Sequence, residues 1–239
     1  MIILKKVIFG GVPGMVQEDI EKMERYVLEE ALDVNFYFYG EDTLSKYELL
    51  DVAKDAEVII SWDQEMDDEI YSKLNLKAYC AASTGFNAAN LEAATRNGVY
   101  VVNVPDYCTH EVSTHAITLM LSLYRRTYKM YDYVRDGHWD LDPMDNINRF
   151  ENSTVGLLGF GRIPQMVAKK IIGFTVNVIA YDPFLDEKFM EEIGVEKVEL
   201  EELLTKSDYL SIHAPLMDST FEIINKESIS KMKDGVMLI

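Results

Sequence analysis

Two glycines in the second half of the chain stand where an apolar segment gives way to a helical pattern. Gly159 and Gly161 directly precede the apolar spacing of residues 162–172, which is typical of a helix. Glycines at such a junction allow a tight turn and the close approach of a pyrophosphate. The backbone N–H groups of Arg162 and Ile163, at the start of the helix, would then bind that anion. The pattern favours a dinucleotide-binding loop over an ordinary strand–helix turn.

A carboxylate follows at the spacing expected for a ribose ligand. Asp182 ends the next apolar segment, 21 positions after Gly161, near the roughly 20 positions of the fingerprint. A carboxylate there accepts hydrogen bonds from the ribose diol and repels a 2′-phosphate, which favours NAD over NADP. The third glycine of the fingerprint is replaced by Pro164. Proline is tolerated in a first helical turn, but its bulk is expected to shift the helix against the strand.

Two further positions could take part in binding. His213 follows the apolar segment 208–212, at the strand end that faces the cofactor crevice in a doubly wound sheet. A histidine that only packs is the alternative. Ser83-Thr84-Gly85 ends another apolar segment, where backbone N–H groups could hold a substrate carboxylate. A plain turn is the alternative there, and both alternatives stay open.

Metal sites are not expected. His110-Glu111 and His115 resemble a zinc-protease helix, but the two histidines are five positions apart, which puts their rings about 140° apart around a helix. Three aspartates resemble a calcium loop, yet no glycine turns it, and a solvated acidic loop is the better interpretation. They are Asp140, Asp142 and Asp145.

Short apolar segments alternate with segments of helical period along the whole chain. This alternation predicts βαβ units around mostly parallel sheets, with a break at Pro105 and no clear period from about residue 128 to 150. The predicted strands are 7–9, 35–39, 57–60, 77–82, 100–104, 154–159, 176–181, one around 198, 208–212 and 235–239. The predicted helices are 16–32, 44–53, 68–74, 90–97, 109–128, 162–172, 186–193 and 200–205.

Composition excludes several classes of protein. The 239 residues include 23 basic and 41 acidic side chains, a net charge of −18, and such a field repels nucleic-acid phosphates. No apolar run approaches the ~20 residues of a membrane helix, and the first ten residues read as a buried strand rather than a signal peptide. Cys80 and Cys108 form no CxxC, which indicates reduced thiols and a cytoplasmic location.

Several stretches together resemble one known family, the D-isomer-specific 2-hydroxyacid dehydrogenases. In its middle the chain is most similar to the branch of phosphoglycerate dehydrogenases and C-terminal-binding-protein corepressors. The matching stretches are 81–87, 91–94, 103–109 with Glu111 and His115, 123–126, 159–163, 181–183, 211–215, 224–225 and 231–235.

The resemblance implies an α/β fold in two parts. Residues 1–104 would form a flavodoxin-like substrate domain. Residues 105–239 would form a Rossmann-type, doubly wound NAD-binding domain that is incomplete at its C-terminus. A dimerisation arm would span about residues 106–150, which implies a two-fold homodimer.

The resemblance also assigns roles to residues. The backbone of Ser83, Thr84 and Gly85 would hold the carboxylate of a small 2-keto or 2-hydroxy acid. Thr109 would lie near the nicotinamide. The remaining cofactor contacts would come from Gly159, Phe160, Gly161, Arg162, Ile163, Asp182, Pro183, His213, Ala214 and Pro215.

The catalytic residues are the main departure from the family. Its members use an arginine, a glutamate and a histidine that follow the strand predicted at 235–239, so residues 1–239 are expected to hold none of them and to be inactive alone. The resemblance implies an NAD-dependent dehydrogenase that moves a hydride between NAD(H) and a 2-keto or D-2-hydroxy acid. The alternatives are a non-catalytic NAD(H)-binding interaction or sensor protein, a truncated gene relic, or an α/β protein whose glycine loop binds nothing.

Overall fold

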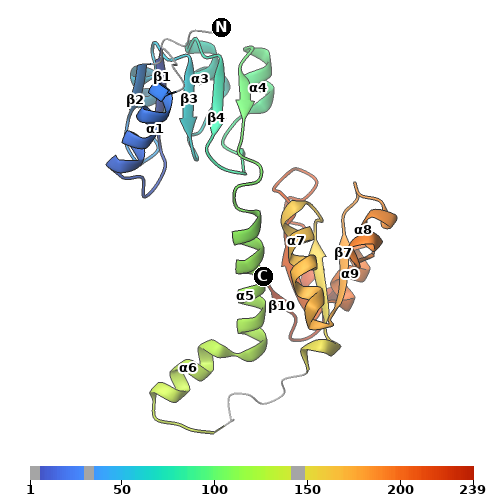
Figure 1. The fold of residues 1–239 in the computed structure, drawn as a ribbon. Coiled ribbons are helices and arrows are strands. Elements are labelled where there is room, and N and C mark those ends of the chain that lie inside the picture. The colour runs from blue at the N-terminus through green and yellow to red at the C-terminus, as the bar shows by residue number, and fades with distance from the viewer. Residues whose placement is uncertain (1–5, 30–34, 141–148) are drawn as a thin grey trace. The chain divides into compact units, whose positions relative to one another are not determined.

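The chain folds as two α/β units that divide between Tyr107 and Cys108. The structure, a computed structural model, describes residues 6–29, 35–140 and 149–239 (Figure 1). Both units are built from parallel strands joined by helices, as the alternation of the sequence predicts. Within the described ranges no helix is long and apolar enough to cross a membrane.

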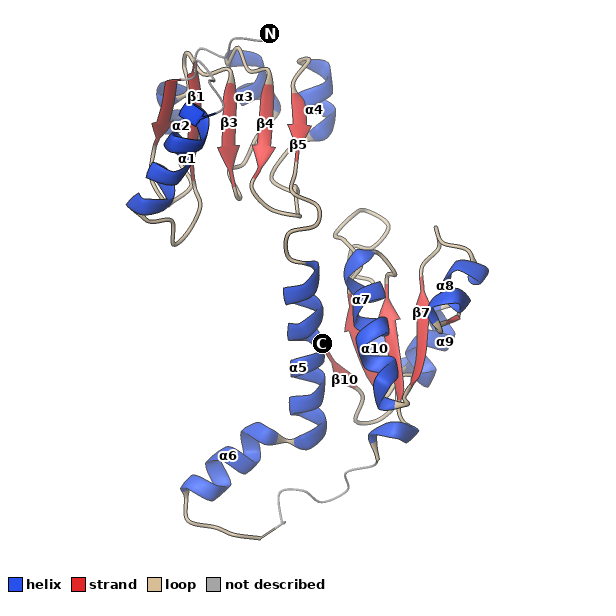
Figure 2. Ribbon diagram, viewed as in Figure 1, coloured by secondary structure: helices blue, strands red, loops and turns tan. Residues whose placement is uncertain are grey.

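The first unit holds a five-stranded parallel sheet in the order β2-β1-β3-β4-β5 (Figure 2). This is the flavodoxin-like order, which confirms the predicted fold class of this half. The strands are β1 (Lys6–Gly10), β2 (Asn35–Phe38), β3 (Val58–Ser61), β4 (Ala78–Ala81) and β5 (Tyr100–Val102). The helices are α1 (Gln17–Glu29), α2 (Lys46–Val52), α3 (Asp68–Lys73) and α4 (Leu91–Arg96).

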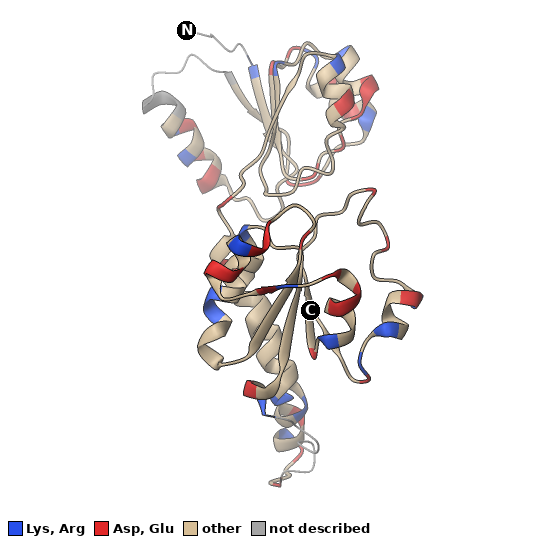
Figure 3. Cartoon of the chain, turned by 90° about the vertical axis from the view of Figure 1, so that its right-hand side faces the viewer, with Lys and Arg blue, Asp and Glu red and all other residues tan. Residues whose placement is uncertain are grey.

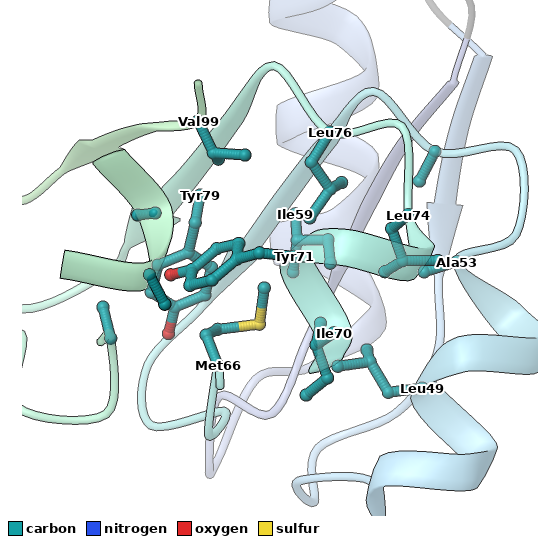
Figure 4. Close-up of a cluster of buried hydrophobic side chains, with 14 of the residues drawn as sticks. Leu49, Ala53, Ile59, Met66, Ile70, Tyr71, Leu74, Leu76, Tyr79 and Val99 are labelled. Carbon is teal, nitrogen blue, oxygen red and sulfur yellow. The ribbon is translucent and has the colours of Figure 1, made fainter. Parts of the chain in front are cut away.

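The core of the first unit lies between the sheet and helices α2, α3 and α4. Ile59 and Tyr79, on the neighbouring strands β3 and β4, are fully buried against Ile70 and Tyr71 of α3 (Figure 4). The Tyr79 hydroxyl donates a hydrogen bond to a backbone carbonyl, that of Gln64. Burial raises the pKa of Tyr71 to about 12. These tyrosines therefore serve packing and stay protonated.

The second unit holds a second five-stranded parallel sheet, in the order β10-β9-β6-β7-β8. Its strands are β6 (Thr154–Leu158), β7 (Asn177–Tyr181), β8 (Glu196–Lys197), β9 (Tyr209–Ile212) and β10 (Met237–Leu238). The order reverses at β6, from which one branch runs to β7 and β8 and the other to β9 and β10. In doubly wound sheets, ligands bind at such a reversal, at the carboxyl ends of the strands.

Helices on both faces complete the second unit. The α-helices are α5 (Thr109–Arg125), α6 (Thr127–Arg135), α7 (Arg162–Ile171), α8 (Glu187–Ile193), α9 (Leu200–Lys206) and α10 (Lys226–Lys231), with short 3₁₀ helices η2 (Phe150–Asn152) and η3 (Ile172–Phe174). Helix α5 packs along α7, and its Ala116, Ile117 and Met120 belong to the core of this unit. Figure 3 shows acidic and basic residues interspersed over the helices of both units.

The prediction of one helix over 109–128, followed by a stretch without period, was wrong in two respects. Helix α5 ends at Arg125, its C-cap Arg126 is left-handed with φ 49°, and α6 follows at once. No residue of α6 is buried, so the helix does not pack into the core, and its Tyr128, Tyr131 and Val134 are exposed. Local contacts stabilise it instead. Arg135 donates a hydrogen bond to the Tyr131 hydroxyl, and Tyr133 stacks on His138 with ring centres 4.4 Å apart.

Helix α10 was not predicted either. It is short, and only Ser228 of its residues is buried. Its start is fixed by a capping box, in which the Asn225 side chain accepts from the backbone of Ser228 and the Ser228 hydroxyl accepts from the Asn225 N–H. The helix therefore depends on local polar bonds rather than on an apolar face.

Candidate functional site

The turn after β6 brings the carboxyl ends of two strands into direct contact. Gly159 has φ +87°, and a Cβ at this position would lie 3.0 Å from the Ala214 nitrogen and 3.2 Å from the His213 carbonyl carbon. A side chain at this position would suffer both the left-handed conformation and the contact with backbone. Only glycine therefore fits between the end of β6 and the segment that follows β9.

Phe160 anchors this turn through its side chain and through both polar groups of its backbone. The ring is fully buried in the core of the second unit. The Phe160 N–H donates to Asp182 Oδ2 at 2.9 Å, and the Phe160 carbonyl accepts from Gln165 Nε2 at 2.9 Å. Because the residue after β7 and a residue of α7 each supply one of these side-chain partners, the turn is held in one conformation before any ligand binds.

Asp182 is placed beside the turn by the register of the sheet. Tyr181 pairs with Leu158, so the residue after β7 lies next to the residues after β6. Its second carboxylate oxygen, Oδ1, accepts from the Phe184 N–H at 2.9 Å. Each oxygen thus receives one backbone N–H and keeps lone pairs with which a ribose diol could bond. Pro183, the next residue, is exposed.

The N-terminus of α7 has the features of an anion site. Gly161 is its N-cap, and no side chain of the described residues caps the helix there. A Cβ on Gly161 would meet no atom within 4 Å, so the space in front of the glycine is open. The positive end of the helix dipole at Arg162 and Ile163 faces an anion that approaches through this space. The arrangement fits the pyrophosphate of a dinucleotide.

Pro164 is accommodated as the third residue of α7. It is buried, and the helical hydrogen bonds begin directly after it, where the Gln165 N–H donates to the Gly161 carbonyl at 3.1 Å. The proline therefore lies in the first turn, where its missing N–H costs nothing. The expected shift of the helix against the strand stays a prediction.

His213 follows β9 at the same edge of the sheet. Its N–H donates to the Leu158 carbonyl at 2.8 Å, and its Nε2 lies 2.8 Å from the hydroxyl oxygen of Ser211. Burial lowers the pKa of the His213 imidazole to about 4, so the ring is neutral at pH 7. Ala214 and Pro215 continue the segment, and Ala214 is the residue that contacts Gly159.

The N-terminal end of helix α5 is connected to α7 by hydrogen bonds. Thr109, the first residue of α5, is buried. The Lys170 ammonium donates to the His110 carbonyl at 3.0 Å, to the Ser113 hydroxyl at 2.8 Å and to the Thr114 hydroxyl at 2.7 Å. One lysine thereby fixes the first turn of α5. The predicted contact of Thr109 with a nicotinamide stays a prediction.

In the first unit, the segment after β4 forms a turn that side-chain hydrogen bonds hold in place. The buried Ser83 hydroxyl donates to the Gly85 carbonyl at 2.6 Å, and the Thr84 carbonyl accepts from Asn103 Nδ2 at 2.9 Å. Side-chain bonds therefore hold the backbone of Ser83, Thr84 and Gly85 in shape. Its role toward a carboxylate stays a prediction.

The histidines and aspartates that resemble metal motifs in the sequence do not form a cluster among the described residues. His110 and His115 are both exposed on α5, and Asp140 accepts a hydrogen bond from the Tyr133 hydroxyl at 2.7 Å. Asp142, Asp145 and part of the predicted arm lie outside the described residues. Among the residues that are described, no cluster of histidine, cysteine or acidic side chains could hold a metal ion.

Comparison with known proteins places this geometry in a family. A family model described as "D-isomer specific 2-hydroxyacid dehydrogenase, NAD binding domain" matches residues 117–239. A hydroxypyruvate reductase of Thermotoga maritima is 33% identical over 223 residues, which are 92% of this chain and 70% of that protein.

The chain belongs to the D-isomer-specific 2-hydroxyacid dehydrogenases. A 2-hydroxyacid dehydrogenase homologue of Haemophilus influenzae is 37% identical over 171 residues, which are 72% of this chain and 51% of the relative. Among solved structures, D-lactate dehydrogenase from Aquifex aeolicus complexed with NAD and lactic acid is similar, with a TM-score of 0.85 and 31% identity over 97% of this chain and 67% of that one. The predicted family and its NAD-binding domain are confirmed. The chain spans about half the length of the first two curated relatives.

Sequence reasoning missed three residues that shape the site of this family member. Gln165 forms a hydrogen bond with the glycine turn, and Ser211 forms one with the ring of His213. Lys170 connects α5 to α7 through hydrogen bonds. Gln165 lies one helical turn after Gly161 and Ser211 two positions before His213. These spacings, and for Ser211 its place in the matching stretch 211–215, are the signals that could have indicated these two residues. Nothing in the sequence indicates the contact between Lys170 and α5, because the two are about sixty residues apart.

Proposed function

We propose that the second unit binds NAD(H) across the carboxyl ends of β6, β7 and β9. The pyrophosphate would lie at Gly161 and the start of α7, with the adenosine ribose on Asp182. His213, Ala214 and Pro215 would line the nicotinamide half. The observation that carries the proposal is the Asp182–Phe160 hydrogen bond, because it ties the ribose ligand to the pyrophosphate turn. A ligand that contacts both residues would therefore bind to a preorganised site.

The reaction we infer is hydride transfer between NAD(H) and a small 2-keto or D-2-hydroxy acid. When bound, the nicotinamide supplies or accepts the hydride. The neutral ring of His213 and the turn at Gly159 would orient the cofactor, and Thr109 would lie near its reactive end. The backbone of Ser83, Thr84 and Gly85 would hold the acid's carboxylate. Relatives named hydroxypyruvate reductase, glyoxylate reductase and D-lactate dehydrogenase support this substrate class.

In the family that the chain resembles, turnover depends on an arginine, a glutamate and a histidine. An arginine clamp and a histidine proton donor contribute positioning and general acid–base catalysis, the latter about 10²–10⁴-fold. Residues 1–239 are expected to bind NADH. A polypeptide that also carries those residues is expected to reduce glyoxylate, pyruvate or hydroxypyruvate. Binding without turnover in that longer polypeptide would favour the alternative of an NAD(H)-responsive interaction protein.

We also propose that the protein is a two-fold homodimer through residues 106–150 and works in the cytoplasm. Helix α6 supports the dimer, because it has no buried residue and exposes Tyr128, Tyr131 and Val134. Such exposed apolar side chains often mark a protein interface. Light scattering is expected to give the mass of two chains, and Tyr131→Asp is expected to lower the measured mass toward that of one chain.

A glycine pair tests the cofactor site directly. In Gly161→Ala the methyl group meets no protein atom within 4 Å but occupies the space in front of α7. Because alanine is a poorer N-cap than glycine, we expect the free energy of unfolding to fall by about 1 kcal/mol and the NADH dissociation constant to rise about tenfold or more. The control is Gly173→Ala, whose methyl also meets nothing within 4 Å but lies in η3, at the other end of α7.

NADH fluorescence and thermal shift on the 239-residue chain give both readouts. Unchanged NADH affinity in Gly161→Ala, or a folded wild-type chain that gives no NADH signal, would overturn the proposal. Equal weakening of NADH binding in both alanine variants would also contradict it.

A further inference from the structure

Ser211 and His213 form a hydrogen-bonded pair at the carboxyl end of β9. Ser211 is 1% exposed, and its hydroxyl oxygen lies 2.8 Å from Nε2 of the His213 ring. The backbone around the ring is fixed as well, because the His213 N–H donates to the Leu158 carbonyl and Gly159 packs against residues 213 and 214. With its backbone and one ring nitrogen held, the imidazole has one orientation.

The burial of Ser211 determines which group donates. The structure gives its hydroxyl no hydrogen-bond partner among the described residues except His213. If the ring donated from Nε2, the hydroxyl proton of a buried serine would be left unpaired, which costs about 1–3 kcal/mol. If the serine donates, its proton is paired and the neutral ring carries its own proton on Nδ1. The second arrangement is the favourable one.

The topology of the sheet indicates which half of a dinucleotide would lie beside His213. The strand order reverses at β6, with β7 on one side and β9 on the other. Asp182, the proposed ribose ligand, follows β7, so the adenosine half lies on that side. A dinucleotide that crosses the reversal puts its nicotinamide half on the side of β9, where His213 lies. The accessible acceptors of that half are oxygens, on its ribose and its carboxamide.

We propose that Ser211 is a positioning residue that fixes His213 as a neutral Nδ1–H donor to an oxygen of the nicotinamide half of the dinucleotide. The inference rests on the proposed function for its ligand, whereas the tautomer follows from Ser211 and His213 alone. Ser211 itself contacts no cofactor. It acts by holding both the orientation and the proton of the ring.

Nitrogen NMR of the histidine rings tests the tautomer. In the ¹⁵N-labelled 239-residue chain at pH 7.5, two-bond ¹H–¹⁵N correlations are expected to show His213 protonated at Nδ1. Ser211→Ala is expected to give a mixture of tautomers and a roughly three- to tenfold higher NADH dissociation constant, which corresponds to one hydrogen bond. Ser211→Thr keeps the hydroxyl and is expected to restore both.

Ser207→Ala is the matched control. Ser207 is as buried as Ser211, but its hydroxyl donates to the Leu203 carbonyl, so this variant loses a buried hydrogen bond without touching His213. A wild-type ring protonated at Nε2 would overturn the proposal even if Ser211→Ala fails to fold. Equal NADH affinities of Ser211→Ala and Ser207→Ala would also overturn it. A wild-type chain that binds no NADH would remove the proposed function and the ligand, while the NMR result would still decide the role of Ser211.

Discussion

The Asp182 carboxylate accepts a 2.9 Å hydrogen bond from the Phe160 N–H, and this bond joins the end of β7 to the turn after β6. The two residues are 22 positions apart. The bond gives Asp182 a structural role beside the ligand role that its spacing predicts. Both roles can be separated by experiment, because one concerns the free chain and the other the complex.

Substitution of Asp182 is expected to change stability and cofactor choice together. Asp182→Asn can still accept one of the two backbone N–H bonds but loses the charge. We expect a free energy of unfolding about 1–3 kcal/mol lower, an NADH dissociation constant about tenfold higher, and a smaller preference for NADH over NADPH. Urea unfolding measures the free energy, and fluorescence titration with NADH and NADPH measures the dissociation constant and the preference. Glu187→Gln, an equal charge change at the exposed start of α8, should leave all three values unchanged.

Gly159→Ala is expected to destabilise the second unit severely. The residue would adopt φ +87° and its methyl would press on the backbone of residues 213 and 214 at 3.0–3.2 Å. The strain and the contact together should cost about 2–4 kcal/mol in the free energy of unfolding. Denaturant midpoints of this variant and of Gly161→Ala form the comparison. Equal midpoints would mean that the turn relaxes around the methyl group.

Gln165 is expected to affect binding more than folding. Gln165→Met removes the bond to the Phe160 carbonyl and should raise the NADH dissociation constant roughly three- to tenfold. Gln165→Glu also puts a negative charge near the proposed pyrophosphate, so its effect should be larger and should shrink at high salt. Titrations at low and high ionic strength distinguish the two variants. A salt-independent difference would argue against an anion at this end of α7.

His213 should make stability fall at acidic pH. In the unfolded chain the imidazole takes up a proton near pH 6.5, whereas in the folded chain it does so only near pH 4. Between these values the unfolded state binds more protons, so the free energy of unfolding decreases as the pH falls. The contribution of this group should be about 3 kcal/mol at most. Urea unfolding from pH 7.5 to 4 should show a shallower decline in His213→Asn than in the wild type, and parallel curves would contradict it.

More of the fold than of the candidate site could be predicted from the sequence. Each strand in the part of the chain that the structure describes was expected, because buried parallel strands leave short apolar runs between helical patterns. Helices α6 and α10 were missed; both are short, at 9 and 6 residues, and Ser228 is the one residue of the two helices that is buried. The glycine turn and Asp182 could be predicted because the spacing of Gly161 and Asp182 matches a dinucleotide fingerprint. Gln165, Ser211 and Lys170 act through contacts that only the folded backbone creates.

The three bonds of Lys170 are expected to stabilise the attachment of α5. Lys170→Met removes all of them and should lower the free energy of unfolding by about 1–3 kcal/mol. Lys169→Met is the control, because the neighbouring lysine is exposed. Hydrogen exchange should also become faster in the first turn of α5 in Lys170→Met alone. Equal exchange in the two variants would show that packing against α7 suffices.

The attachment of α5 has a mechanical consequence. The chain leaves the second unit just before Thr109, so a pulling force applied through the first unit enters the second at the first turn of α5. Lys170 holds this turn to α7, the helix whose start is the proposed pyrophosphate site. Tension on the connecting segment would therefore reach the cofactor helix before the sheet. Lys170 and the packing of Ala116, Ile117 and Met120 would share the load that passes to that helix.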